Sequence, residues 1–166
     1  MKWSEIDLTG VKLAIFDFDG TLALHEDENF AQRRKESDEA YINFFTSAYE
    51  NPETFYDETE PCRRSEALYT LIREMRKRNI KIFCLSGMGL TFHLRAKQAF
   101  VNKYYGDDIE VLTVASQDRK LKGVQILQNI VGCNSDEVLF VDDLREVIKF
   151  LSENGIKGIH ADEITM

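Results

Sequence analysis

The chain has 166 residues, a length that suits one domain. Hydrophobic residues make up 43% and charged residues 30% of the chain, which excludes the low-hydrophobicity composition of disordered proteins. With 21 Lys and Arg against 29 Asp and Glu, the formal net charge is −8, which argues against a domain whose main task is non-specific binding to long nucleic acid.

The first residues contain no apolar leader segment, and no stretch approaches the roughly 18 apolar residues of a membrane span. We therefore expect a soluble, cytoplasmic protein with no membrane partner. Cys62, Cys84 and Cys133 are odd in number and widely spaced, with no CxxC pair. They are expected to be reduced thiols, not a disulfide framework or a zinc site.

Short apolar runs alternate with longer amphipathic segments along the chain. The apolar runs are typical of buried parallel strands and cover 11–16, 80–85, 109–115, 138–141 and 155–159. Helical spacing is found at 67–75, 90–101, 124–131 and 144–151, and Gly132 and Gly155 stand where helices would end. This alternation predicts an α/β fold, a doubly wound, Rossmann-like three-layer sandwich with a central parallel five-stranded sheet. Ligands of such sheets bind at the carboxyl ends of the strands.

The first predicted strand is followed directly by Asp17-Phe18-Asp19-Gly20-Thr21. Two carboxylates two residues apart at the end of a buried strand are an unusual placement. One interpretation is a capped turn, in which Asp side chains accept backbone N–H bonds and Gly supplies a positive φ. The other interpretation is a functional site.

Further polar residues follow the other predicted strands. They are Ser86-Gly87, a loop with Lys120 and Lys122, and Asp142-Asp143. Acids gathered at one edge repel one another unless a cation is present, and Mg²⁺ prefers oxygen ligands, so a magnesium site is predicted. Local alternatives remain, since Ser86 and the acid pair could each cap the helix that follows, and either lysine could be a solvated loop residue.

In this order, the motifs resemble those of the haloacid dehalogenase superfamily. The four motifs are the Asp17 to Thr21 segment, Ser86-Gly87, a lysine ahead of a helix, and Asp142-Asp143 after an apolar run. The match extends from Val11 to His160, apart from an insert. The resemblance implies a single domain over 1–166, Mg²⁺ as cofactor and hydrolysis of a phosphomonoester through an aspartyl phosphate.

The resemblance also implies residue roles. Asp17 is the expected nucleophile, and Asp19 the general acid and then base. The Asp17 carboxylate, the Asp19 backbone carbonyl and Asp142 are the expected magnesium ligands, while Asp143 either supports the metal site or orients Lys120. Which acid of the Asp142-Asp143 pair binds the metal directly stays open. Dehalogenating relatives lack an acid at the position of Asp19, so this residue favours phosphatase chemistry, with a mutase as a less favoured outcome.

The phosphoryl group is expected to contact Ser86, assisted by the backbone N–H groups of Gly20, Thr21 and Gly87. For the lysine, the family spacing counts back about twelve residues from a helix-ending glycine. From Gly132 this count favours Lys120 over Lys122, with apolar Val124, Leu127 and Val131 at the matching helix positions.

An insert over 23–62 follows the first motif and is predicted to be a small, helical, cap-like segment. Its aromatic residues could form a lid or simply cover the core, and its basic residues, Arg33, Arg34, Lys35, Arg63 and Arg64, could meet a second anion on the substrate. His25 follows the first motif closely and is expected to border the entrance. His93 and His160 are expected to be structural or exposed.

Three functions compete. The favoured one is a Mg²⁺-dependent phosphatase that acts on a small phosphorylated molecule. A phosphatase acting on a nucleic-acid end or a phosphoprotein is the second, although the net charge opposes nucleic acid. A catalytically idle binding domain is the third, and the presence of Asp19 argues against it. A homo-oligomer is compatible with all three.

Overall fold

The computed structural model describes residues 1–25, 62–87 and 91–166. Its centre is a five-stranded sheet with the order β5-β4-β1-β6-β7, in which every neighbouring pair is parallel. The predicted sheet is thereby confirmed, with strand ends displaced by a few residues. The strands are β1 (Leu13–Phe16), β4 (Lys81–Ser86), β5 (Glu110–Thr113), β6 (Val138–Asp142) and β7 (Lys157–His160).

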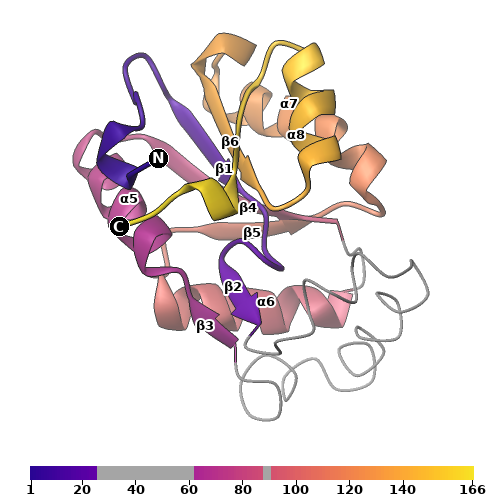
Figure 1. The fold of residues 1–166 in the computed structure, drawn as a ribbon. Helices are drawn as coiled ribbons and strands as arrows, with labels where there is room; N and C mark the ends of the chain where they lie inside the picture. Colours follow the sequence, from indigo (N-terminus) through magenta and orange to yellow (C-terminus); the bar gives the residue numbers. More distant parts are fainter. Residues whose placement is uncertain (26–61, 88–90) are drawn as a thin grey trace.

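Two pairs of helices cover the opposite faces of this sheet (Figure 1). Alternate side chains of β1 divide between the faces: Ala14 and Phe16 belong to the core on the α5 and α6 side, and Leu13 and Ile15 to the core on the α7 and α8 side. The three-layer prediction is therefore confirmed. The helices are α5 (Glu66–Lys77), α6 (Thr91–Tyr104), α7 (Lys120–Val131) and α8 (Arg145–Glu153), and the short 3₁₀ helices are η1 (Trp3–Glu5), η2 (Gln117–Arg119), η3 (Ser135–Glu137) and η4 (Ala161–Glu163).

Helix ends follow the chemistry of the sequence. The Ser65 side chain accepts a hydrogen bond from the Leu68 backbone N–H and caps the start of α5. Gly132 ends α7 with φ of 74°, a left-handed conformation that glycine adopts without strain. Gly132 thus ends the helix that Lys120 begins, as the count from the glycine assumed.

A second, two-stranded sheet was not predicted. In it β2 (Ala23–His25) pairs antiparallel with β3 (Cys62–Arg64). The two strands are the ends of the predicted insert, so the insert leaves and rejoins the domain at one place. The helices expected between them, with Arg33, Arg34 and Lys35, fall in 26–61 and lie outside the described residues.

None of the three cysteines forms a disulfide, as predicted. Cys84 is buried in β4, and burial, together with the nearby Asp17 carboxylate, raises the pKa of its thiol. In the ranges that the structure describes, no helix has the length and apolar character needed to cross a membrane.

We expect Leu127→Ala to lower the free energy of unfolding by about 2–5 kcal/mol, because the side chain is fully buried against the sheet and its removal leaves a cavity. Ile130→Ala, on the exposed side of the same helix, is expected to change it by less than about 0.5 kcal/mol. Urea unfolding of both variants tests the pair. Equal losses would contradict the placement of the two faces of α7.

Candidate active site

The site lies where the chain order of the sheet reverses. From β1 the chain adds β4 and β5 on one side, and then β6 and β7 on the other. Phe16 pairs with Val141 in neighbouring strands, and the Asp17 N–H donates to the Val141 carbonyl at 2.8 Å. Asp17 and Asp142 are therefore neighbours at the carboxyl ends of two adjacent strands, which is where ligands bind in sheets of this kind.

Lys120 joins these two acids. Its Nζ donates to Asp17 Oδ1 at 2.7 Å and to Asp142 Oδ2 at 2.6 Å, and its side chain is fully buried. Burial alone would lower the pKa of Lys120, but the charges of Asp17 and Asp142 outweigh it and raise that pKa, so the ammonium stays charged. Lys122 is exposed. The structure thus brings Lys120, not Lys122, to the predicted position.

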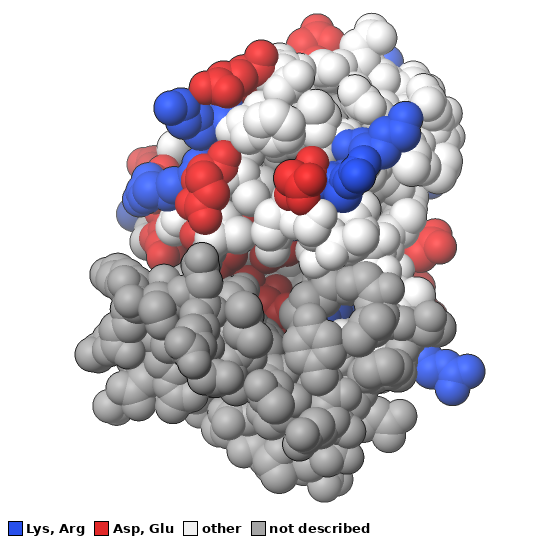
Figure 2. Space-filling view, turned by 90° about the vertical axis from the view of Figure 1, so that its right-hand side faces the viewer, with Lys and Arg blue, Asp and Glu red and all other residues white. Residues whose placement is uncertain are grey.

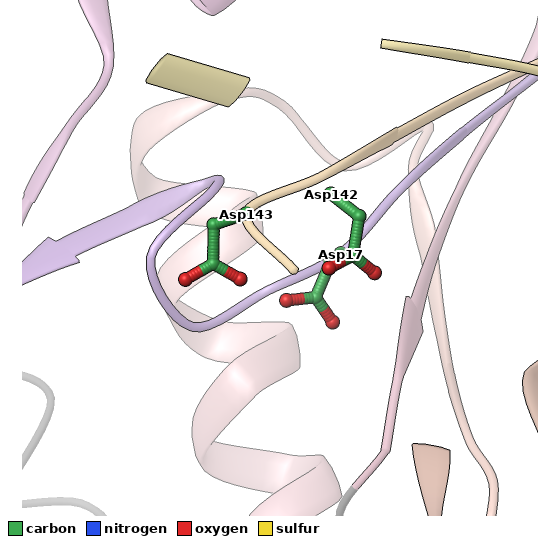
Figure 3. Close-up of side chains that lie close together, drawn as sticks. All are labelled: Asp17, Asp142 and Asp143. Atoms are coloured by element: carbon green, nitrogen blue, oxygen red, sulfur yellow. The ribbon is translucent and has the colours of Figure 1, made fainter. Parts of the chain in front are cut away.

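Asp17, Asp142 and Asp143 form an acidic group at this edge (Figure 3). Each offers a carboxylate oxygen, and these oxygens lie within 4.8 Å of one another. Burial, and then the neighbouring Asp17 charge, raise the pKa of Asp142 to about 7. Hard oxygen donors with excess negative charge fit a divalent cation such as Mg²⁺.

The expectation that Asp143 orients Lys120 is wrong. The hydrogen bonds of Lys120 go to Asp17 and Asp142, and the second oxygen of Asp142, Oδ1, accepts from the Leu144 N–H at 2.8 Å. Asp142 is therefore the acid that holds the lysine. Which acid of the pair would bind a metal directly is not decided by these contacts.

Gly20 is required at its position for two reasons. Its φ is +78°, a conformation that residues with a side chain rarely adopt. In addition, a Cβ at Gly20 would overlap with the Asp143 carboxylate. The turn after β1 can approach the acidic group only because residue 20 has no side chain.

Asp19 is held by two residues that the sequence motifs do not include. Its Oδ2 accepts from Lys97 Nζ at 2.9 Å, and its Oδ1 lies 3.1 Å from His25 Nε2. Burial would raise the pKa of Asp19, but the Lys97 charge and the His25 hydrogen bond outweigh it and hold that pKa below its usual value. His25 Nδ1 in turn lies 3.2 Å from Cys62 Sγ, so pairing of β2 with β3 places the imidazole.

The sequence pattern itself indicates a buried position for Lys97. The helical pattern included Leu94 and Val101, and Lys97 occupies the inward position between them, at the i+3 and i−4 spacing. A lysine on the apolar side of a predicted helix indicates a buried charge that needs a partner. The identity of that partner, 78 residues away, depends on the fold.

The predicted phosphoryl contacts are also grouped here. Ser86 is the last residue of β4, is 1% exposed and accepts a hydrogen bond from Lys97 Nζ at 2.6 Å. The described part of α6 begins at Thr91 and residues 88–90 lie outside the described ranges, so the interpretation of Ser86 as a helix cap is not tested. Thr21 is buried, and its Oγ1 has no hydrogen-bond partner in the part of the chain that the structure describes.

The other residues considered in the sequence have different surroundings. Arg64 forms an ion pair with Glu66 and lies over the Tyr69 ring at 3.8 Å, so its charge is already used within the domain. His93 and His160 are buried, consistent with structural positions. On the described part of the face in Figure 2, Lys and Arg lie interspersed with Asp and Glu and form no continuous basic patch.

No family model matches the chain, and no curated protein matches it either. Solved structures do. A HAD family enzyme from Bacteroides thetaiotaomicron, solved as a magnesium complex, is 16% identical with a TM-score of 0.56, and the match covers 91% of this chain and 93% of that one. A haloacid dehalogenase-like hydrolase from Bacteroides fragilis is 15% identical with a TM-score of 0.60, and the match covers 89% of this chain and 86% of that one. A protein assigned as a phosphoglycolate phosphatase from Lactobacillus delbrueckii subsp. bulgaricus is 15% identical with a TM-score of 0.57, and the match covers 90% of this chain and 85% of that one. The chain thus has the haloacid dehalogenase fold that its motifs predict.

We expect Lys120→Met to lower the free energy of unfolding of the metal-free protein by about 3–5 kcal/mol, because it leaves two buried carboxylates without their cation. Lys122→Met removes an exposed lysine from the same helix and is expected to cost less than about 0.5 kcal/mol. Chemical unfolding in EDTA measures both. Similar losses for the two variants would contradict the assignment of Lys120.

Proposed function

We propose that this chain is a Mg²⁺-dependent phosphohydrolase that cleaves a phosphomonoester through an aspartyl phosphate on Asp17. The observation that carries the proposal is the Lys120 ammonium bonded to both Asp17 and Asp142, beside a third carboxylate from Asp143. This arrangement fixes one oxygen of the Asp17 carboxylate at the edge of the sheet. The similarity to a HAD family enzyme solved with magnesium supports the choice of cation.

Asp17 supplies the nucleophile. One carboxylate oxygen forms a bond to phosphorus while the bond from phosphorus to the leaving oxygen breaks. Lys120, bonded to Asp17 Oδ1, holds the carboxylate in place and adds positive charge beside the phosphoryl oxygens. A bound Mg²⁺ would offset the repulsion between the carboxylate and the phosphate. Asp17, Asp143 and the Asp19 backbone carbonyl would hold it, and Asp142 is a further candidate ligand.

Asp19 supplies the proton transfers. Because Lys97 and His25 hold the free carboxylate ionised, Asp19 takes up a proton from solvent or from a protonated substrate phosphate on binding and gives it to the leaving oxygen in the first step. In the second step the regenerated carboxylate takes a proton from the water that attacks phosphorus and releases Asp17. Both oxygens of the carboxylate contact neighbours, Lys97 and His25, so its direction is fixed. A domain that only bound phosphate would not need this acid, which argues against a catalytically idle protein.

A small phosphorylated molecule is the proposed substrate class. Two of the similar structures carry the names of enzymes of such molecules, a phosphoglycolate phosphatase and a beta-phosphoglucomutase. The net charge of −8 opposes the steering of a nucleic-acid end to the site. The insert over 23–62 is proposed to act as a small cap, with β2 and β3 as its base.

Hydrolysis of p-nitrophenyl phosphate tests the proposal. Turnover is expected with Mg²⁺ and not with EDTA, and Asp17→Asn is expected to lower kcat at least about 1,000-fold because it removes the nucleophile. Asp107→Asn changes an exposed acid outside the acidic group, in the turn before β5, and is expected to retain wild-type turnover. Activity in EDTA, or full activity of Asp17→Asn, would refute the mechanism.

Metal binding is expected to depend on Asp143. Asp143→Asn removes one charged oxygen donor from the acidic group and is expected to weaken Mg²⁺ binding at least about tenfold. The rise in melting temperature on addition of Mg²⁺, measured as a function of its concentration, gives the affinity. The exposed Asp107→Asn again serves as the control. An unchanged affinity in Asp143→Asn would assign the metal to Asp17 and Asp142 alone.

A further inference from the structure

A second buried lysine enters the site from the opposite layer to Lys120. Lys97 extends from α6, whereas Lys120 begins α7 on the other face of the sheet. The Lys97 side chain is fully buried, with its Nζ 5.0 Å from the centre of the Phe18 ring. Its hydrogen bonds to Asp19 Oδ2 and to Ser86 Oγ join the proposed acid to the proposed phosphoryl-binding residue.

The direction of the Ser86 hydroxyl follows from this contact. An ammonium has three N–H donors and no acceptor, so Ser86 Oγ must be the acceptor in its 2.6 Å bond with Lys97. The hydroxyl hydrogen must then point away from Lys97. No described residue accepts this hydrogen, because the Lys97 bond is the one hydrogen bond that the structure gives the Ser86 side chain. The hydroxyl is a buried donor at the end of β4 with no acceptor among the described residues, so it can donate to a ligand or a solvent molecule.

We propose that Lys97 is a positioning residue of the phosphoryl site: it orients the Ser86 hydroxyl toward a phosphoryl oxygen. This inference rests on the proposed function, since the phosphoryl group is the acceptor. Asp19 anchors the ammonium on one side, and the Phe18 ring lies close to it. The substrate therefore meets a donor that is already aligned, and little reorganisation is needed on binding.

A purely structural role for Lys97 makes a different prediction. If the lysine only secured α6 to Asp19, its loss and the loss of the Ser86 hydroxyl would act independently, and their effects on kcat/KM would multiply. If the lysine acts through Ser86, its removal from a protein that already lacks the Ser86 hydroxyl is expected to change kcat/KM very little. A double-mutant cycle of Ser86→Ala and Lys97→Met separates the two.

The cycle is measured as kcat/KM for p-nitrophenyl phosphate at saturating Mg²⁺. Lys97→Met is expected to lower it about 100-fold, the usual size of the loss of one aligned oxyanion donor, and the double variant is expected to lie within about threefold of Ser86→Ala alone. Lys103→Met, an exposed lysine on the same helix, is expected to match the wild type. Losses that multiply, or a wild-type value for Lys97→Met, would overturn the proposal.

Two further measurements keep the test decisive. If the methionine variant does not fold, Lys97→Arg is used instead, because it keeps the charge beside Asp19 but changes the geometry of the donor. A loss of kcat/KM of about tenfold or more in this variant supports the proposal. A wild-type kcat/KM would overturn it. Binding of inorganic phosphate with Mg²⁺, measured by calorimetry, needs no turnover. A wild-type protein that binds phosphate but hydrolyses nothing refutes the proposed function alone. Phosphate binding that is unchanged in Lys97→Met refutes the role of Lys97.

Discussion

Four carboxylates gather at the carboxyl ends of two adjacent parallel strands, and their repulsion is the constraint on which the rest of the site depends. Buried charges of one sign are stable only when cations and hydrogen bonds compensate them. Lys120 meets Asp17 and Asp142, and Lys97 meets Asp19. The remaining negative charge explains why the acidic group fits a divalent cation.

The three layers of the fold make this compensation possible. Helices α6 and α7 lie on opposite faces of the sheet, so each delivers one buried lysine to the same edge from its own side. The turn at Gly20 brings the chain back close to Asp143, and β2 then carries His25 to Asp19. The architecture thus serves to place two cations and one imidazole around acids that β1, β6 and the turns after them hold together.

Much of this was accessible from the sequence. The five apolar runs predicted the strands because buried parallel strands are apolar on both faces, and the order of motifs predicted which strand ends carry the acids. The family spacing, counted back from Gly132, favoured Lys120, and the structure places this lysine against Asp17 and Asp142. The expected contact between Asp143 and Lys120 was wrong, since the rotamers of neighbouring acids are not set by local pattern.

The sequence by itself determined the sheet, its layers, and the set of acids and the alcohol at the strand ends, because each follows from the periodicity of short segments. Only the tertiary structure decided which cation meets which acid. Lys97 and Asp19 are 78 residues apart, and Lys120 and Asp17 are 103 apart. Such contacts exist because packed helices bring side chains from distant parts of the chain within about 3 Å of one another, a distance on which hydrogen bonding and charge compensation both depend.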